Sequence, residues 1–186
     1  MQPDTISPLL RELEETRQKY WNIDPEAAQV LEALIHTAKP ASILEVGTSN
    51  GYSAIRMARV ASQYGGHVHT IEFFQERIDE AQRNIERAGL SKNITIHKGD
   101  AVEVLPQLEQ SGSKFQFVFL DGNKEEHATY FSSAMRMCPA GGIIVADNTV
   151  SHKEKLSAFF DAVDAEPRAS ALHLSIGTGL LVITVS

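Results

Sequence analysis

The chain has 186 residues, of which 42% are apolar and 22% are charged, and this size is typical of one compact domain. The formal net charge of -7 argues against a general affinity for nucleic acids or anionic membranes. Because no apolar run approaches the roughly 18 residues of a membrane span and no signal-peptide pattern is present, we expect a soluble, cytoplasmic protein. The single cysteine, Cys138, excludes an internal disulfide, and no Cys/His cluster has zinc-finger spacing, so oxygen ligands must hold any metal.

The N-terminal 40 residues predict two helices. Three leucines within residues 9–13 lie among charged side chains without a strong hydrophobic stripe, which predicts a surface or capping helix. Asp24 can cap the second helix, Pro25 suits its first position, and Pro40 ends it.

From residue 42 onward, short apolar runs alternate with longer helical stretches. The predicted strands are Ile43–Val46, His67–Glu72, Ile94–His97, Phe115–Leu120 and Gly142–Ala146. The predicted helices between them are Tyr52–Tyr64, Phe74–Ala88, Ala101–Glu109 and Lys124–Met137. Strict alternation of strand and helix predicts a doubly wound, mainly parallel α/β sheet with right-handed crossovers.

The last 36 residues close this pattern with a reversed strand. A predicted helix over Ser151–Val163 precedes two strand-like runs, Ala171–Ile176 and Leu180–Val185. Only three residues separate these runs, which is too short for a parallel crossover, so they must form an antiparallel hairpin. We therefore expect a Rossmann-like sheet of seven strands, ending in this hairpin.

The ends of the first three strands carry a pattern typical of a nucleoside cofactor site. Gly47 and Gly51 let the chain turn sharply and approach a ligand, and Glu72, 25 residues after Gly47, can accept hydrogen bonds from ribose hydroxyls. The loop lacks the middle glycine of a dinucleotide fingerprint, which favours a cofactor without phosphates, such as S-adenosylmethionine. Asp100 follows the third strand, where it could accept from an adenine amino group. The alternatives are an ordinary βα turn and a solvated strand end.

The fourth and fifth strands deliver Asp121 and the pair Asp147-Asn148. If these strands are neighbours, their ends lie about 5 Å apart, and two carboxylates with an amide suit Mg²⁺, Mn²⁺ or Ca²⁺. Lys124 is the predicted general base, because an ammonium beside a metal is pushed toward its neutral form. The alternatives are a helix cap at Asp121, a turn at Asp147-Asn148 and a surface lysine. We expect His127 at the rim and no functional role for the histidines of the strands.

Together these motifs resemble those of the cation-dependent O-methyltransferases, the family of catechol O-methyltransferase and the caffeoyl-CoA enzymes. The resemblance covers about residue 23 to the C-terminus. The motifs that carry it are Leu44–Ser53, Ile71–Glu72, Gly99–Ala101, Phe119–Lys124 and Gly141–Asn148.

The resemblance implies the class I S-adenosylmethionine-dependent methyltransferase fold and a role for each motif. The glycine loop and Ser53 would hold the methionine portion of S-adenosylmethionine, Glu72 the ribose, and Asp100 with Ala101 the adenine. The residues expected to bind this cofactor are Glu45, Gly47, Thr48, Ser49, Gly51, Tyr52, Ser53, Glu72, Asp100, Ala101 and Asp121. Those expected to hold Mg²⁺ are Asp121, Asp147 and Asn148, and the expected catalytic residues are Lys124 and Asp121.

The activity implied is methyl transfer to a hydroxyl of a catechol-like or other vicinal dihydroxy small molecule, by a homodimer. Residues 1–186 would form one domain, with N-terminal helices over 1–40 and the catalytic core over 41–186. The alternatives are transfer to a hydroxylated tRNA nucleoside and a non-catalytic cofactor-binding protein, whereas the loop disfavours a nicotinamide oxidoreductase.

The chain also departs from the family pattern. Gly122-Asn123 replaces an alanine or aromatic residue followed by an acid, and His127 stands where a tyrosine is common. The N-terminal cap and the substrate loop are short, since the predicted helix follows Asn148 almost at once. These departures predict an open pocket, suited to a bulky acceptor or to a lid from another subunit.

Overall fold

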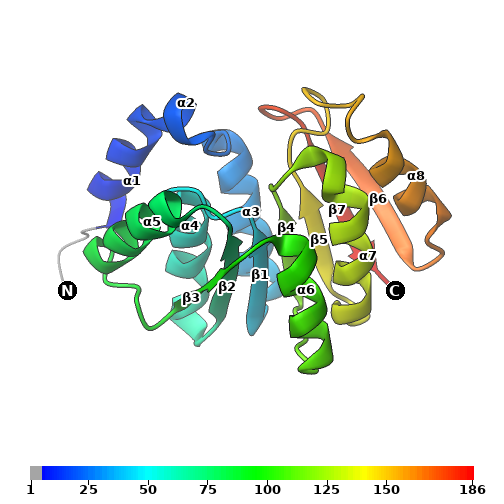
Figure 1. Ribbon diagram of the computed structural model, residues 1–186, viewed down its shortest axis with the longest axis horizontal. Helices are drawn as coiled ribbons and strands as arrows, with labels where there is room; N and C mark the ends of the chain where they lie inside the picture. The colour runs from blue at the N-terminus through cyan, green and yellow to red at the C-terminus, as the bar shows by residue number, and fades with distance from the viewer. Residues whose placement is uncertain (1–5) are drawn as a thin grey trace.

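The computed structural model describes residues 6–186, and a seven-stranded sheet of order β3-β2-β1-β4-β5-β7-β6 forms its centre (Figure 1). The strands are β1 (Ser42–Val46), β2 (His67–Glu72), β3 (Ile94–Lys98), β4 (Phe117–Leu120), β5 (Ile143–Ala146), β6 (Ala169–Leu174) and β7 (Leu180–Val185). Strands β1 to β5 are parallel, whereas β7 runs antiparallel to β5 and β6. The predicted fold class, with its C-terminal hairpin, is confirmed.

Both faces of the sheet are covered, which explains why β4 and β5 are apolar at every position. In β4, Phe117 and Phe119 pack into one apolar core, whereas Val118 and Leu120 pack into the other. The first face carries α1 (Ile6–Glu15), α3 (Pro25–Ala38), α4 (Tyr52–Ala61) and α5 (Gln75–Arg87). The second carries α6 (Ala101–Gln110), α7 (His127–Met137) and α8 (Ser157–Ala165). The short helices are α2 (Arg17–Tyr20), η1 (Ser62–Tyr64) and η2 (Lys124–Glu126).

The N-terminal helices are packed more firmly than their sequence pattern predicts. Leu9, Leu10 and Leu13 are each only 4% exposed and belong to the first apolar core, so α1 buries a complete apolar face. The expectation of a helix without a strong hydrophobic stripe is therefore wrong. Asp24 caps α3 as predicted, because its side chain accepts a hydrogen bond from the Glu26 amide.

The predicted helix over Ser151–Val163 begins only at Ser157. The amide of Thr149 donates to the carbonyl of Gly179, and the amides of Val150 and Ser151 donate to that of Thr178. These residues are therefore bound to the turn between β6 and β7 and do not start a helix. The expectation that a helix follows Asn148 almost at once is wrong, since turns occupy residues 149–156.

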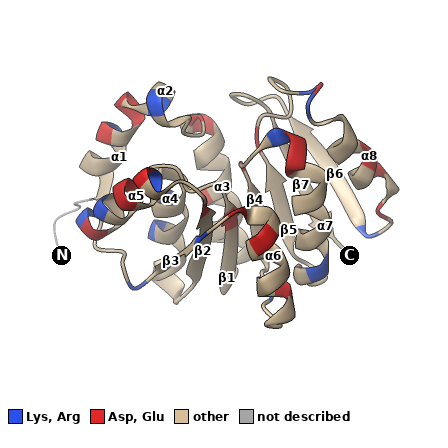
Figure 2. Cartoon of the chain, viewed as in Figure 1, with Lys and Arg blue, Asp and Glu red and all other residues tan. Residues whose placement is uncertain are grey.

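Within residues 6–186, no helix combines the length and the apolar character needed to cross a membrane. In the view of Figure 2, the Lys and Arg positions along the ribbon of the described residues are scattered among those of Asp and Glu. This distribution agrees with the low affinity for polyanions that the net charge predicts.

Candidate functional site

The candidate site lies where the order of the parallel strands reverses, between β1 and β4. From β1 the sheet extends to β2 and β3 on one side and to β4 and β5 on the other. Val46 pairs with Leu120 at the carboxyl ends of β1 and β4, so the loops that follow begin side by side (Figure 1). In open α/β sheets this crevice is where ligands bind.

The glycine loop passes directly over the start of the Asp121 segment. A Cβ atom at Gly47 would lie 2.7 Å from the backbone oxygen of Asp121, and Gly47 has a φ of +100°. Its amide also donates to the carbonyl of Ile71 in β2. Gly47 is therefore required both by its conformation and by the close approach of two backbones.

A buried polar network supports this loop from below. Glu45 is 0% exposed and accepts hydrogen bonds from Ser53 and, at 2.6 Å, from Thr70, whose hydroxyl lies 2.5 Å from that of Thr48. Burial raises the pKa of Glu45 to about 8 in spite of these donors, so the carboxyl is mostly protonated at neutral pH. Glu45 is thus inaccessible to a ligand in this conformation, and direct contact of Glu45, Thr48 or Ser53 with a cofactor stays a prediction.

Tyr52 is also turned into the protein rather than toward the crevice. Its hydroxyl donates to Glu14 of α1 at 2.7 Å and accepts from Arg56, which in turn forms an ion pair with Glu32 of α3. The side chain therefore ties the N-terminal helices to α4. Any contact of Tyr52 with a cofactor would have to come from its backbone.

Glu72 lies at the predicted ribose position and is held firmly there. Its carboxylate accepts hydrogen bonds from the amides of Ser49 at 2.8 Å and of Phe73 and Phe74 at 3.0 Å each. Three bonds leave about one of the four acceptor positions of a carboxylate free for a ligand. The contact with Ser49 also joins the end of β2 to the glycine loop.

Asp100 follows β3 and caps α6, since its Oδ1 accepts from the amide of Val102 at 3.0 Å. Gly99, with a φ of +145°, donates its amide to the carbonyl of Glu72. The segment that includes Ala101 therefore lies beside the end of β2. This position fits the predicted adenine contact, although it also gives Asp100 a purely structural role.

Asp121 and Asp147 follow β4 and β5, which are neighbours as predicted, with Leu120 paired to Ala146. Burial, reinforced by the charge of Asp121, raises the pKa of Asp147 to about 7. The ammonium of Lys124 lies 2.8 Å from Oδ1 of Asp121, and both side chains are largely buried. Among the described residues, no group of three His, Cys, Asp or Glu side chains could hold a metal, so a third protein ligand would have to come from an amide such as that of Asn148.

Asp121 does not cap a helix, which was the alternative role considered for it. Asn123, not Asp121, caps the following helix by accepting a hydrogen bond from the Glu125 amide at 3.3 Å. The predicted helix from Lys124 starts as the short helix η2, and α7 follows from His127. The carboxylate of Asp121 is therefore not used to cap the backbone and faces Lys124.

Thr178 is a residue of this site that the sequence did not reveal. Its hydroxyl donates to Oδ1 of Asp147 at 2.7 Å, from the turn between β6 and β7. Because β7 runs antiparallel to β5, with Leu181 opposite Ala146, the turn before β7 lies at the carboxyl end of β5. The predicted hairpin was the available signal, but the sequence does not say which edge of the sheet its turn reaches.

His127 was expected at the rim, and this is wrong, because its side chain is fully buried. Its Nδ1 lies 2.9 Å from the carbonyl oxygen of Asn123, and its ring packs near those of Tyr130 and Phe159. Burial lowers the pKa of His127. The residue therefore belongs to the packing of α7 against α8.

Three strand histidines without a predicted role form a cluster on β2 and β3. Nδ1 of His69 lies 3.0 Å from Nε2 of His97, and the rings of His67 and His69 are 4.9 Å apart. Burial, together with the neighbouring rings of His67 and His97, lowers the pKa of His69 to about 4. Period-two spacing puts His67 and His69 on one face of β2, but only the pairing with β3 brings His97 to them.

Comparison with known proteins gives the same picture. A model of the O-methyltransferase family matches residues 3–184. A catechol O-methyltransferase of Niastella koreensis is 37% identical over 130 residues, which cover 69% of this chain and 58% of that protein. One of Mycobacterium tuberculosis is 36% identical over 108 residues, or 58% of this chain and 48% of that protein. The matches thus span about half to three fifths of these two relatives.

A solved structure extends the likeness to the whole fold. The crystal structure of an O-methyltransferase from Bacillus cereus, in complex with S-adenosylhomocysteine, superposes with a TM-score of 0.86 at 28% identity. The superposition covers 100% of this chain and 92% of that one. The family model and the fold agree over nearly the full length, and the chain belongs to the O-methyltransferase family.

Proposed function

We propose that this chain transfers a methyl group from S-adenosylmethionine to a hydroxyl of a catechol-like or other vicinal dihydroxy small molecule, with the help of a divalent cation. The observation that carries the proposal is the pairing of β4 with β5 beside the glycine loop. It sets Asp121 next to Asp147 on one side and Gly47 on the other. Two relatives named catechol O-methyltransferase and a Bacillus cereus relative in complex with S-adenosylhomocysteine support the same reading.

The side chains at the end of β4 and β5 fit a hard cation. Asp121, Asp147 and Asn148 offer oxygen atoms, and the raised pKa of Asp147 reflects burial next to a second carboxylate. A cation bound to both carboxylates would relieve this repulsion, and Thr178 would keep Asp147 oriented through the 2.7 Å hydrogen bond. When bound, S-adenosylmethionine supplies the methyl group and the divalent cation supplies positive charge that favours the ionised hydroxyl of the acceptor.

Lys124 is the proposed base. Its Nζ lies 2.8 Å from Asp121, so a hydroxyl seated beside that carboxylate comes within reach of it. In its neutral form Lys124 would accept or relay the hydroxyl proton. On the cofactor side, Glu72 would accept from a ribose hydroxyl, and the glycine loop would leave room for the methionine portion. Positioning by these groups supplies most of the acceleration.

The acceptor side is proposed to be open. The turns at residues 149–156 follow Asn148 directly, and Val150 is 62% exposed in them. The exposed stretch over residues 150–155 would leave room for an acceptor larger than a simple diphenol, or for a lid from a second subunit.

Substitution of Asp147 by alanine tests the metal role. We expect Asp147→Ala to lower methyl transfer to a diphenol by at least about 100-fold, because metal assistance is worth several kcal/mol. Its dissociation constant for S-adenosylhomocysteine, measured by calorimetry, should stay close to that of the wild type. Asp161→Ala, which changes an exposed carboxylate of α8, serves as the matched control. Transfer by Asp147→Ala at the wild-type rate would contradict the metal role, and cofactor binding without transfer to any diphenol would indicate a non-catalytic protein.

A further inference from the structure

Three segments that are distant in the sequence meet at Ser49 of the glycine loop. The hydroxyl of Ser49 donates to the carbonyl of Tyr20, the last residue of α2, at 2.6 Å. Arg77 of α5 donates to the same hydroxyl from Nη1 at 3.2 Å, and the amide of Ser49 donates to Glu72. Ser49 thus joins α5 and Glu72 to the N-terminal cap, by which we mean α1, α2 and Trp21.

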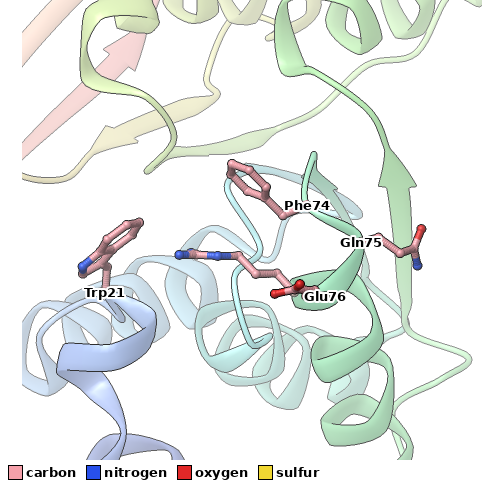
Figure 3. A pocket seen from close by; sticks show the side chains of 5 residues that line it. Trp21, Phe74, Gln75 and Glu76 are labelled. Carbon is pink, nitrogen blue, oxygen red and sulfur yellow. The ribbon is translucent and has the colours of Figure 1, made fainter.

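Arg77 makes a second contact with the cap through Trp21. Its guanidinium carbon lies 4.6 Å from the centre of the Trp21 ring and 5.8 Å from that of Phe74. Both aromatic residues line a pocket of about 410 Å³, and Figure 3 shows Trp21 on one side of it and Phe74 on the other. Within residues 6–186, the ion pairs of the structure do not include Arg77, so its charge is directed at the aromatic rings.

The backbone on both sides of this contact is strained. Trp21 has a φ of +54° and Ser49 a φ of +50°, in the left-handed region that side chains other than glycine rarely adopt. Such conformations persist only where surrounding contacts hold them. Here Arg77 contacts both residues, and the hydroxyl of Ser49 also bonds to Tyr20, the neighbour of Trp21.

The contact holds the Tyr20-Trp21 turn, which ends the N-terminal helices α1 and α2, and not those helices themselves. Helix α1, which comes before α2, is fixed by its buried leucines and by the bond between Glu14 and Tyr52. Trp21, in contrast, is 74% exposed although it is a large apolar side chain. The residues that follow, Asn22 and Ile23, are buried again, so any opening is confined to the Tyr20-Trp21 turn with its exposed indole.

We propose that Arg77 is a positioning residue that latches the Tyr20-Trp21 end of the cap onto the glycine loop and thereby strengthens cofactor binding at Ser49 and Glu72. The inference rests on the proposed function, because it assumes that S-adenosylmethionine and its product bind at this loop. Arg77 itself takes no part in methyl transfer. When the contacts of Arg77 with Ser49 and Trp21 are broken, the glycine loop is less ordered, and the cofactor must order it on binding, which weakens the affinity.

Trp21 is the only tryptophan of the chain, so its fluorescence reports directly on the latch. The experiment compares wild type, Arg77→Ala, Arg77→Lys, Trp21→Ala and Trp21→Phe, with Arg83→Ala as control, since Arg83 lies on the same helix and forms its ion pair with Glu80 of that helix. We expect Arg77→Ala to change the Trp21 emission and to raise the dissociation constant for S-adenosylhomocysteine by about three- to tenfold, from loss of one stacked cation and one hydrogen bond. Trp21→Phe should bind like the wild type, and Arg77→Lys should lie between.

Two further readouts separate the latch from general damage. Urea unfolding identifies a variant that has lost its fold, and in that case Arg77→Lys, which keeps the charge, carries the test. The double variant Arg77→Ala with Trp21→Ala should weaken binding no more than Arg77→Ala alone, because Trp21 acts through its contact with Arg77. Wild-type affinity and emission in the folded Arg77 variants, or additive effects in the double variant, would overturn the latch. Failure of the wild type to bind S-adenosylhomocysteine would instead overturn the proposed function.

Discussion

Replacement of Gly47 by alanine tests the close approach of the two loops. The new Cβ would lie 2.7 Å from the oxygen and 3.0 Å from the carbon of Asp121, and 3.2 Å from the amide nitrogen of Gly122. All three are backbone atoms, so neither loop can relieve the overlap by rotating a side chain. The positive φ adds about 1–2 kcal/mol of strain, and the overlap adds about 1–3 kcal/mol.

Gly112→Ala is the matched control for this variant. Gly112 has a φ of +78°, but no atom lies within 4 Å of its added Cβ, so it reports the strain alone. Urea unfolding should show a loss of about 1–2 kcal/mol for Gly112→Ala and about 2–5 kcal/mol for Gly47→Ala. Only Gly47→Ala should also lower methyl transfer, because Asp121 must move. Equal losses of stability in the two variants, with activity intact, would refute the reasoning.

Two other predictions concern pH. Burial raises the pKa of Glu45 to about 8 in the folded chain, above its unfolded value near 4.5, so the wild type loses stability as the pH rises from about 4.5 to 8. Glu45→Gln lacks this loss, and its free energy of unfolding should gain on the wild type between pH 5 and 8; a constant difference would mean that Glu45 is ionised in the fold. His69 has the opposite sign, because its pKa falls to about 4 from an unfolded value of 6.5. The wild type should therefore lose stability relative to His69→Gln as the pH falls from about 6.5 to 4, and parallel pH profiles would contradict the buried, neutral histidine pair.

The topology could be predicted because each of its rules is local. Alternation of strands and helices predicts a parallel sheet, and the three-residue connection before Leu180 permits only a hairpin. Strand ends could be identified for the same reason, so Gly47, Glu72, Asp121 and Asp147 were found without knowledge of the packing. Their common edge follows from the parallel direction of the strands.

The remainder depends on contacts between distant segments. The start of α8 was misplaced because the amides of residues 149–151 are bound by the carbonyls of Thr178 and Gly179, almost 30 residues later. Glu45 was expected to face a ligand, since nothing local shows that Thr70 and Ser53 enclose it. The contacts of Ser49 with Tyr20 and Arg77 could not be predicted either, because nothing in the local sequence indicates that a loop serine will bind the end of α2.

The packing of α1 against the core could not be predicted from the sequence either. Three leucines among charged residues give a narrow apolar face, and the sequence alone does not show whether another element covers it. In the structure α3, α4 and α5 enter the same apolar core, so the face is buried completely. Tertiary packing, and not the sequence pattern of α1, therefore determines whether its apolar face is buried.

The most direct test of the central claim is methyl transfer by the wild-type chain. Labelled S-adenosylmethionine is mixed with a diphenol in the presence of Mg²⁺ or of a chelator, and the labelled product is analysed for the methylated atom. The account predicts methylation of one hydroxyl oxygen with Mg²⁺ and loss of nearly all transfer in chelator. Transfer that is equally fast in chelator would contradict the role of Asp121, Asp147 and Asn148, and binding of the cofactor without transfer to any diphenol would contradict the proposed activity itself.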